Sequence, residues 1–178
     1  YKNFCQECPS GRYTNQYGIQ SIDNCILCPK GTWNSEFGQT EITSCKGCDR
    51  GLYGDELGMT YKGSCKKCPP GKFNSNVGLS NANDCKECST GSYSSSGSEK
   101  CKPCDIGKYA LVMGSSECLE CDAGKYANNT GSYLCSNCPS KSEQNNKKTG
   151  CMCSENAYNT HPNNNKLNCI KCNDTFTC

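Results

Sequence analysis

The nine residues Cys101-Lys-Pro-Cys104-Asp-Ile-Gly107-Lys-Tyr109 decide the fold of this chain, because their pattern recurs along most of its 178 residues. Two cysteines stand three positions apart, a glycine follows the second cysteine at the third position, and an aromatic residue follows at the fifth. The aromatic positions of the seven copies are Tyr13, Trp33, Tyr53, Phe73, Tyr93, Tyr109 and Tyr126. A repeat of fixed spacing indicates that each copy is one structural unit, which packs mainly against its neighbours.

The repeat has a long and a short form. Cysteine pairs begin every 20 residues from Cys5 to Cys85, and then at steps of 16 or 17, at Cys101, Cys118 and Cys135. A second glycine precedes each following pair, at Gly18, Gly38, Gly58, Gly78, Gly97, Gly114 and Gly131. Six residues separate this glycine from the next cysteine in the long form and three in the short form. The difference in length is therefore confined to one loop.

The repeated residue types predict the local structure of a unit. Each glycine marks a position that needs a positive φ or a close approach of another backbone, and a proline after the cysteine favours a turn. The aromatic side chain is the one bulky group available to cover each cysteine cross-link. We expect short extended segments, such as residues 12–14 and 32–34, and very little helix, because no window shows a helical apolar period.

These features predict a small disulfide-rich repeat array: an elongated rod of loop-rich units with short β segments. We divide it into long repeats (residues 1–88), short repeats (89–138) and a C-terminal part (139–178). In the last part Lys141 and Glu143 stand where the glycine and the aromatic residue are expected. Residues 139–178 are therefore interpreted as degenerate repeats, or as a cap or junction.

Composition indicates an extracellular protein. The hydrophobic fraction of 34% includes 21 cysteines, which leaves too few ordinary apolar residues for one large core. Disulfides replace such a core in secreted proteins. No stretch is long enough for a membrane helix and none resembles a signal peptide, so we expect a processed chain or a fragment starting at Tyr1. The net charge of +2, with both signs interspersed, indicates neither nucleic acid nor an anionic membrane as partner.

The cysteine spacing also fits a zinc ribbon, but three observations favour disulfides. Tetrathiolate zinc would use the pairs two at a time and give a period of 40, whereas the sequence repeats every 20 residues. The chain has one histidine, His161, and its 21 cysteines do not divide into fours.

The repeat period favours a sequential pairing, in which the second cysteine of one pair bonds to the first cysteine of the next. Pairing first with first and second with second remains an alternative, although it doubles the period. The sequential scheme predicts Cys8–Cys25, Cys28–Cys45, Cys48–Cys65, Cys68–Cys85, Cys88–Cys101, Cys104–Cys118, Cys121–Cys135, Cys138–Cys151, Cys153–Cys169 and Cys172–Cys178. Cys5 is left unpaired, or pairs with another molecule or an upstream unit.

The run Cys101-Lys-Pro-Cys104-Asp-Ile-Gly107-Lys-Tyr109 and its copy from Cys118 to Tyr126 resemble the ephrin-receptor-like cysteine-rich repeat. They are more distantly similar to the modules of tumour necrosis factor receptors. The resemblance extends over residues 5–138 and implies loop-rich, disulfide-stacked rods outside cells. Such repeats occur in receptors, in adhesion proteins and, as long arrays, in the surface coats of ciliates and other protists.

No catalytic constellation is present, so we do not expect an enzyme, a bound metal or another cofactor. His161 stands alone among asparagines, and the scattered acidic residues show no calcium-binding pattern. Two sequons, at Asn128 and Asn173, predict covalent N-glycans in loops. Serine and threonine residues near the aromatic positions are candidate O-glycan sites: Thr14, Ser35, Ser75 and residues 94–96.

Two functions fit these observations. The first is an extracellular structural or surface-coat protein that assembles head to tail with copies of itself, with the odd Cys5 at one end and Cys178 at the other. The alternative is the ectodomain of a cell-surface receptor or adhesion protein, with other extracellular proteins as partners. That alternative needs an exposed patch that breaks the repeat, and the chain has only two arginines, Arg12 and Arg50.

Overall fold

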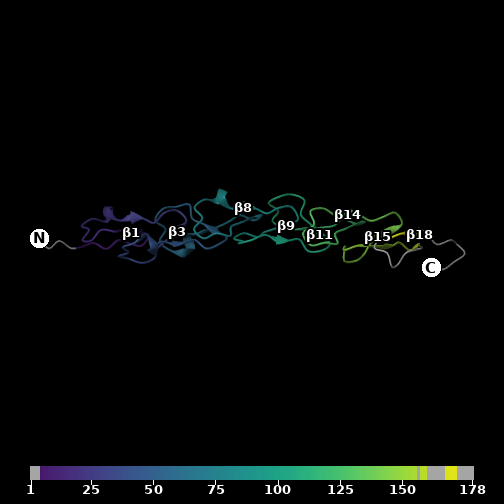
Figure 1. Cartoon of the computed structure of the whole chain (residues 1–178), viewed down its shortest axis with the longest axis horizontal. Helices are drawn as coiled ribbons and strands as arrows, with labels where there is room; N and C mark the ends of the chain where they lie inside the picture. Colours follow the sequence, from purple (N-terminus) through teal and green to yellow (C-terminus); the bar gives the residue numbers. More distant parts are fainter. Residues whose placement is uncertain (1–4, 156, 160–166, 172–178) are drawn as a thin grey trace. The chain divides into compact units, whose positions relative to one another are not determined.

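The computed structural model describes residues 5–155, 157–159 and 167–171. The chain divides into two compact bodies. The first body comprises residues 1–87 and 94–101, and the second comprises residues 88–93 and 102–178. Figure 1 shows that each contains short strands joined by long loops. Each body is described by itself.

Each repeat unit is built around one antiparallel pair of short strands. We define a unit as running from the second cysteine of a pair to the residue before the next second cysteine. The first strand of a unit contains the repeated aromatic residue, and the second strand lies between the next two cysteines. Among the described residues the strands form nine separate two-stranded sheets. Each unit thus has its own sheet, as the short extended segments of the sequence predict.

The strand pairs of the first body belong to the long units. They are β1 (Arg12–Tyr13) with β2 (Ile26–Leu27), β3 (Thr32–Trp33) with β4 (Lys46–Gly47), β5 (Leu52–Tyr53) with β6 (Lys66–Lys67), and β7 (Lys72–Phe73) with β8 (Lys86–Glu87). In each pair the aromatic residue lies opposite the residue after the first cysteine, as Tyr13 lies opposite Ile26.

The second body has the short units and continues the same pairing. Its pairs are β9 (Ser92–Tyr93) with β10 (Lys102–Pro103), β11 (Lys108–Tyr109) with β12 (Leu119–Glu120), β13 (Lys125–Tyr126) with β14 (Ser136–Asn137), β15 (Ser142–Gln144) with β16 (Cys151–Cys153), and β17 (Ala157–Asn159) with β18 (Cys169–Lys171). The last two pairs show that strand pairing persists in the described part of residues 139–171, where the sequence motif is lost.

The extra three residues of the long units form a single 3-10 turn before the first cysteine. These turns are η1 (Ile22–Asn24), η2 (Ile42–Ser44), η3 (Lys62–Ser64) and η4 (Ala82–Asp84). Ser21 and Asn81 cap two of them with side-chain oxygens that accept from the backbone two residues on. Shortening a unit from 20 to 17 residues therefore removes one turn and leaves the sheet intact.

The disulfides have the sequential connectivity. Eight bonds join Cys8–Cys25, Cys28–Cys45, Cys48–Cys65, Cys68–Cys85, Cys104–Cys118, Cys121–Cys135, Cys138–Cys151 and Cys153–Cys169. Cys88 and Cys101 are also disulfide-bonded. The predicted Cys172–Cys178 bond lies outside the described residues. Each of these eight bonds joins the first residue of a unit to the residue before its second strand or, at Cys151 and Cys169, to the first residue of that strand. The closed loop contains the first strand and the segment between the two strands.

The core of a unit is built around its cystine and a small residue, and Ile19 and Met59 are also buried. The second cysteines from Cys8 to Cys121 are at most 1% exposed. The residue after each aromatic is also buried, and this set is Thr14, Asn34, Gly54, Asn74, Ser94, Ala110 and Ala127. The aromatic residues themselves are only half-buried. Because side chains alternate along a strand, the small residue points inward and the aromatic ring covers the outer side.

Candidate functional site

The most regular feature of the molecule is the contact between successive units, which is made by the main chain. Between the first two units, Cys28 N–H donates to the Gly11 carbonyl (2.9 Å) and Gly11 N–H donates to the Asn34 carbonyl (2.7 Å). Thr14 N–H donates to the Gln39 carbonyl (3.0 Å). Gly38 N–H donates to the Cys8 carbonyl (2.8 Å). Neighbouring units therefore exchange hydrogen bonds in both directions.

The same positions are bonded further along each body. Between the second and third units the donors are Cys48, Gly31, Asn34 and Gly58, and the acceptors are the carbonyls of Gly31, Gly54, Met59 and Cys28. In the second body the donors Cys121, Gly107, Ala110 and Gly131 bond to the carbonyls of Gly107, Ala127, Ser132 and Cys104. Because the partners are peptide groups, the interface does not depend on exposed side chains.

The two glycines of the motif meet across alternate units. A Cβ atom placed on Gly11 would lie 2.2 Å from the carbonyl oxygen of Gly58, two units further on. Gly31 has the same relation to Gly78, and Gly51 to Gly97. Gly11 also has φ +78°, a left-handed conformation that favours glycine. The sequence predicted either a positive φ or a close approach of another backbone at each glycine, and Gly11 has both.

Buried polar side chains reinforce the contacts between units. Asn34 is 2% exposed, and its amide Nδ2 donates to the Arg12 carbonyl of the previous unit (3.2 Å). Asn74 donates in the same way to the Leu52 carbonyl (3.1 Å). Ser94 donates from its hydroxyl to the Lys72 carbonyl (2.9 Å). In these three units the small position therefore carries a polar residue that is hydrogen-bonded when buried.

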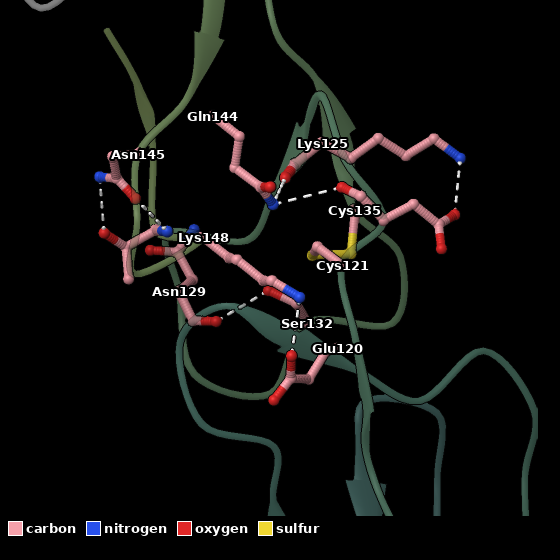
Figure 2. Close-up of a disulfide and its surroundings, with 11 residues drawn as sticks. Glu120, Cys121, Lys125, Asn129, Ser132, Cys135, Gln144, Asn145 and Lys148 are labelled. Atoms are coloured by element: carbon pink, nitrogen blue, oxygen red, sulfur yellow. Dashed lines mark hydrogen bonds and ion pairs between the residues drawn. A yellow bond between two sulfur atoms is a disulfide. The ribbon is translucent and has the colours of Figure 1, made fainter.

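The unit from Cys138 to Met152 retains this architecture without the motif residues. Lys141 (φ +63°) and Lys148 (φ +59°) adopt the left-handed backbone that glycines have in the other units. Gln144 occupies the position of Asn34, and its amide donates to the carbonyl of Lys125 (Figure 2). The backbone contacts and the disulfide thus hold the unit together where sequence similarity fades.

An ion pair accompanies this irregular unit (Figure 2). Lys148 Nζ lies 2.7 Å from Glu120 Oε2. The hydrogen bond from Lys148, and then the charge of Lys148, hold the pKa of Glu120 below its usual value. In the first body, Lys66 similarly lowers the pKa of Asp55 through a hydrogen bond. Both pairs are solvent-exposed and resemble ordinary surface ion pairs rather than a catalytic arrangement.

Among the described residues, two main-chain donors of the first unit lack the partners that their counterparts in later units have. In later units the second cysteine donates its N–H to a glycine carbonyl, and the second glycine donates its N–H to a cysteine carbonyl. Among the described residues, neither Cys8 N–H nor Gly18 N–H has such a partner. Cys5, the first cysteine of the pair, is free and exposed. This open edge, formed by Cys5, Cys8 and Gly18, is a candidate attachment site.

A second candidate site is an exposed apolar loop in the second body. Leu111, Val112 and Met113 are 58%, 62% and 61% exposed. The corresponding loops of the long units carry polar residues followed by one exposed apolar residue, such as Leu57 or Val77. This patch was not predicted from the sequence, although three consecutive apolar residues precede Gly114.

The other predicted sites have mixed outcomes. Asn128 is exposed, as a glycan acceptor requires, whereas Asn173 and His161 lie outside the described residues. O-glycans at Thr14 and Ser94 are a wrong prediction, because these residues are only 7% and 1% exposed. No group of three or more His, Cys, Asp or Glu residues in the described ranges could hold a metal ion. Across the same ranges, no helix has the length and apolar character needed to traverse a bilayer.

Comparison with known proteins supports the repeat assignment. Residues 91–122 match the family model described as tyrosine-protein kinase ephrin type A/B receptor-like. The chain is a cysteine-rich repeat protein. The matched segment contains the Gly91 and Gly107 turns, the Cys104–Cys118 disulfide and the loop Leu111–Met113. No curated protein matches the chain.

Proposed function

We propose that this protein is an extracellular structural component, of the surface-coat type, that assembles head to tail through its repeat units. The observation that carries the proposal is the free, exposed Cys5, which stands at a motif position that is disulfide-bonded in the later units. Among the described residues, the N–H groups of Cys8 and Gly18 lack the partners that their counterparts have. The edge has the geometry that the chain already uses between its own units.

The extracellular location is supported by the disulfides and by the family match. Disulfides of this number persist in oxidising compartments and are rare in the cytosol. The match to an ephrin-receptor-like repeat indicates the same location and a non-enzymatic protein. Within such a compartment, a free exposed cysteine at a position that is otherwise cross-linked favours covalent attachment.

We assign the open edge to another copy of the chain. Its partner must offer a carbonyl for Cys8 N–H, a carbonyl for Gly18 N–H and a sulfur atom for Cys5. A repeat unit provides the two carbonyls through its main chain, and the sulfur comes from one of its disulfides, because every described cysteine other than Cys5 is disulfide-bonded. A contact between unlike surfaces that does not close on itself produces a linear assembly.

The covalent step is a thiol–disulfide exchange. The Cys5 thiolate attacks a disulfide of the second copy. A bond forms between the Cys5 sulfur and one sulfur of that disulfide, the sulfur–sulfur bond within the second copy breaks, and its other cysteine leaves as a thiolate. The number of disulfides is unchanged, so the step needs no oxidant.

The experiment compares the wild-type chain with Cys5→Ser, and uses Glu7→Ser, a neighbouring exposed position, as the control. The proteins are concentrated with oxidised and reduced glutathione and analysed by non-reducing electrophoresis, light scattering and electron microscopy. Wild type and Glu7→Ser are expected to form covalent oligomers that a reductant dissociates. Cys5→Ser is expected to form at most weakly associated, non-covalent oligomers. A wild-type chain that stays monomeric with a free Cys5 thiol rules out the assembly.

The apolar loop supports a second candidate, a receptor or adhesion ectodomain. Leu111, Val112 and Met113 lie within the matched residues 91–122 and expose most of their surface. Val112→Asp tests this function, and Val77→Asp, at a position that is 60% exposed outside the match, is the control. Saturable binding of the chain to cells, lost in Val112→Asp and retained in Val77→Asp, supports the receptor function. Equal binding by both variants contradicts it.

A further inference from the structure

The segment after β13 combines a glycan acceptor with an aromatic surface. It reads Tyr126-Ala127-Asn128-Asn129-Thr130, in which Asn128 begins the sequon and Thr130 provides its hydroxyl. Ala127 is 3% exposed, whereas Asn128 and Thr130 are exposed. Because side chains alternate along an extended chain, Tyr126 and Asn128 point to the same side.

Tyr126 and Asn128 line one open cavity of about 370 Å³. Its other walls include Pro139, Cys151 and Leu167. The cavity therefore places an aromatic ring and aliphatic groups beside the Asn128 amide, which is the acceptor of the sequon. An aromatic ring flanked by apolar groups is a suitable surface for the C–H face of a sugar ring.

The Asn128 side chain is also available for modification. Within the described part of the chain no hydrogen bond is made by its amide, and the residue lies outside the strands. The neighbouring backbone is held in place, because Ala127 N–H donates to the Lys148 carbonyl (3.0 Å) and the Ser132 hydroxyl donates to the Asn129 carbonyl (2.8 Å). Figure 2 shows the latter bond. The acceptor is thus a free side chain on an ordered loop.

We propose that Asn128 carries an N-linked glycan whose first N-acetylglucosamine lies in this cavity against the Tyr126 ring. The glycan comes from a polyprenyl-pyrophosphate donor. A bond forms between Asn128 Nδ2 and the anomeric carbon of the sugar. The bond from that carbon to the pyrophosphate oxygen breaks, the lipid pyrophosphate leaves, and the amide loses one proton to a base of the transferase.

The cavity gives this glycan a protective role. The Cys138–Cys151 disulfide is partly exposed at both cysteines, whereas the second cysteines of earlier units are buried. Cys151 itself lines the cavity, so a sugar placed there covers the disulfide. Attack by an external thiolate requires access to a sulfur atom, and the glycan restricts that access.

The first unit provides a built-in control for this site. Tyr13 and Asn15 hold the same positions relative to their cysteine pair as Tyr126 and Asn128 do, and they line a comparable cavity of about 360 Å³. Asn15 is exposed but is not a sequon, because Tyr17 occupies the hydroxyl position. Tyr17 is 99% exposed, so Tyr17→Thr completes a second sequon without disturbing packing.

The experiment expresses the full chain in a eukaryotic secretory host and measures occupancy of each site by peptide mass spectrometry, with and without an N-glycosidase. We expect modification at Asn128 in the wild type, its loss in Thr130→Ala, and a new modified site at Asn15 in Tyr17→Thr. The sugar protons are expected to show an upfield ring-current shift that disappears in Tyr126→Leu. An unmodified Asn128 in folded, secreted protein overturns the proposal, whatever the state of Asn15.

The protective role is measured by reduction of Cys138–Cys151 with dithiothreitol, followed by alkylation and peptide mapping. Trimming the glycan to a single N-acetylglucosamine should leave the rate unchanged, whereas complete removal should raise it several-fold. Cys68–Cys85 is the internal control, because it is far along the sequence from Asn128. Equal rates before and after complete removal exclude the contact between sugar and cavity. These results require secretion but not self-assembly, so they are independent of the proposed function.

Discussion

At the residue scale, the informative positions are two lysines that have the left-handed backbone conformation favoured by glycine. Lys141 and Lys148 hold positive φ values, +63° and +59°, at positions where earlier units have glycine. A side chain in the left-handed region is strained, so neighbouring contacts must maintain this geometry. The interface with the preceding unit supplies them, since the Lys148 carbonyl accepts from Ala127 N–H.

Lys141→Gly should therefore stabilise its unit. Relief of the left-handed strain outweighs the greater freedom of glycine in the unfolded chain, and we expect a gain of about 1 kcal/mol. Lys147→Gly is the control, because Lys147 is exposed but does not have a positive φ. Hydrogen exchange of the β15 and β16 amides measures the local opening energy. Equal changes in the two variants would contradict the strain argument.

At the scale of the element, the repeat unit is a turn, two short strands and a disulfide, and the two motif glycines of the first unit differ in what surrounds them. Gly11 is needed for its conformation and for the close approach of Gly58, whereas Gly18 (φ +67°) has no atom within 4 Å of a Cβ position. The sequence motif does not distinguish the surroundings of these two glycines. The difference comes from the contact between alternate units, which Gly11 makes and Gly18 does not.

Replacing these two glycines by alanine should give unequal losses. Gly18→Ala is expected to cost about 1–2 kcal/mol, the cost of the left-handed conformation alone. Gly11→Ala places a Cβ 2.2 Å from the Gly58 oxygen and should cost considerably more, since main chain must shift. Chemical denaturation followed by hydrogen exchange gives both values. Protection should fall in the Gly58 segment for Gly11→Ala alone, and similar losses in the two variants would exclude the close approach.

At the scale of the whole molecule, stability is distributed along the repeats. The cores are small and separate, and each is built around a cystine, while repeated main-chain hydrogen bonds link neighbouring units within each body. Arrays of this kind behave as a sum of unit and nearest-neighbour terms. Unfolding is therefore not expected to be a single two-state transition, and mutational effects should remain local.

Removal of one disulfide tests this locality. Replacing Cys48 and Cys65 by alanine opens a loop with a sequence separation of 17 and should cost roughly 3 kcal/mol in the chain-entropy picture. We expect faster hydrogen exchange in β5, β6 and the adjoining units, with unchanged exchange in β13 and β14. Faster exchange throughout both bodies would show that the array unfolds as one cooperative structure.

The sequence by itself determined the unit, because cysteine spacing, paired glycines and one aromatic per copy leave few ways to close each loop. From these it predicted the short strands, the scarcity of helix, the sequential disulfides and the single loop that varies in length. Of the candidate sites, Cys5 and Asn128 are exposed, and their proposed roles stay predictions.

Contacts between units were decided only by the tertiary structure. Peptide groups make the hydrogen bonds between units. Because the peptide group is common to all residue types, the pattern of side chains does not predict which residues are hydrogen-bonded to each other. For the same reason the sequence could not show that Gly11 faces Gly58, or that Lys141 takes the conformation of a glycine. Burial of the small residue instead of the aromatic ring also depends on which side of a short strand faces the cystine.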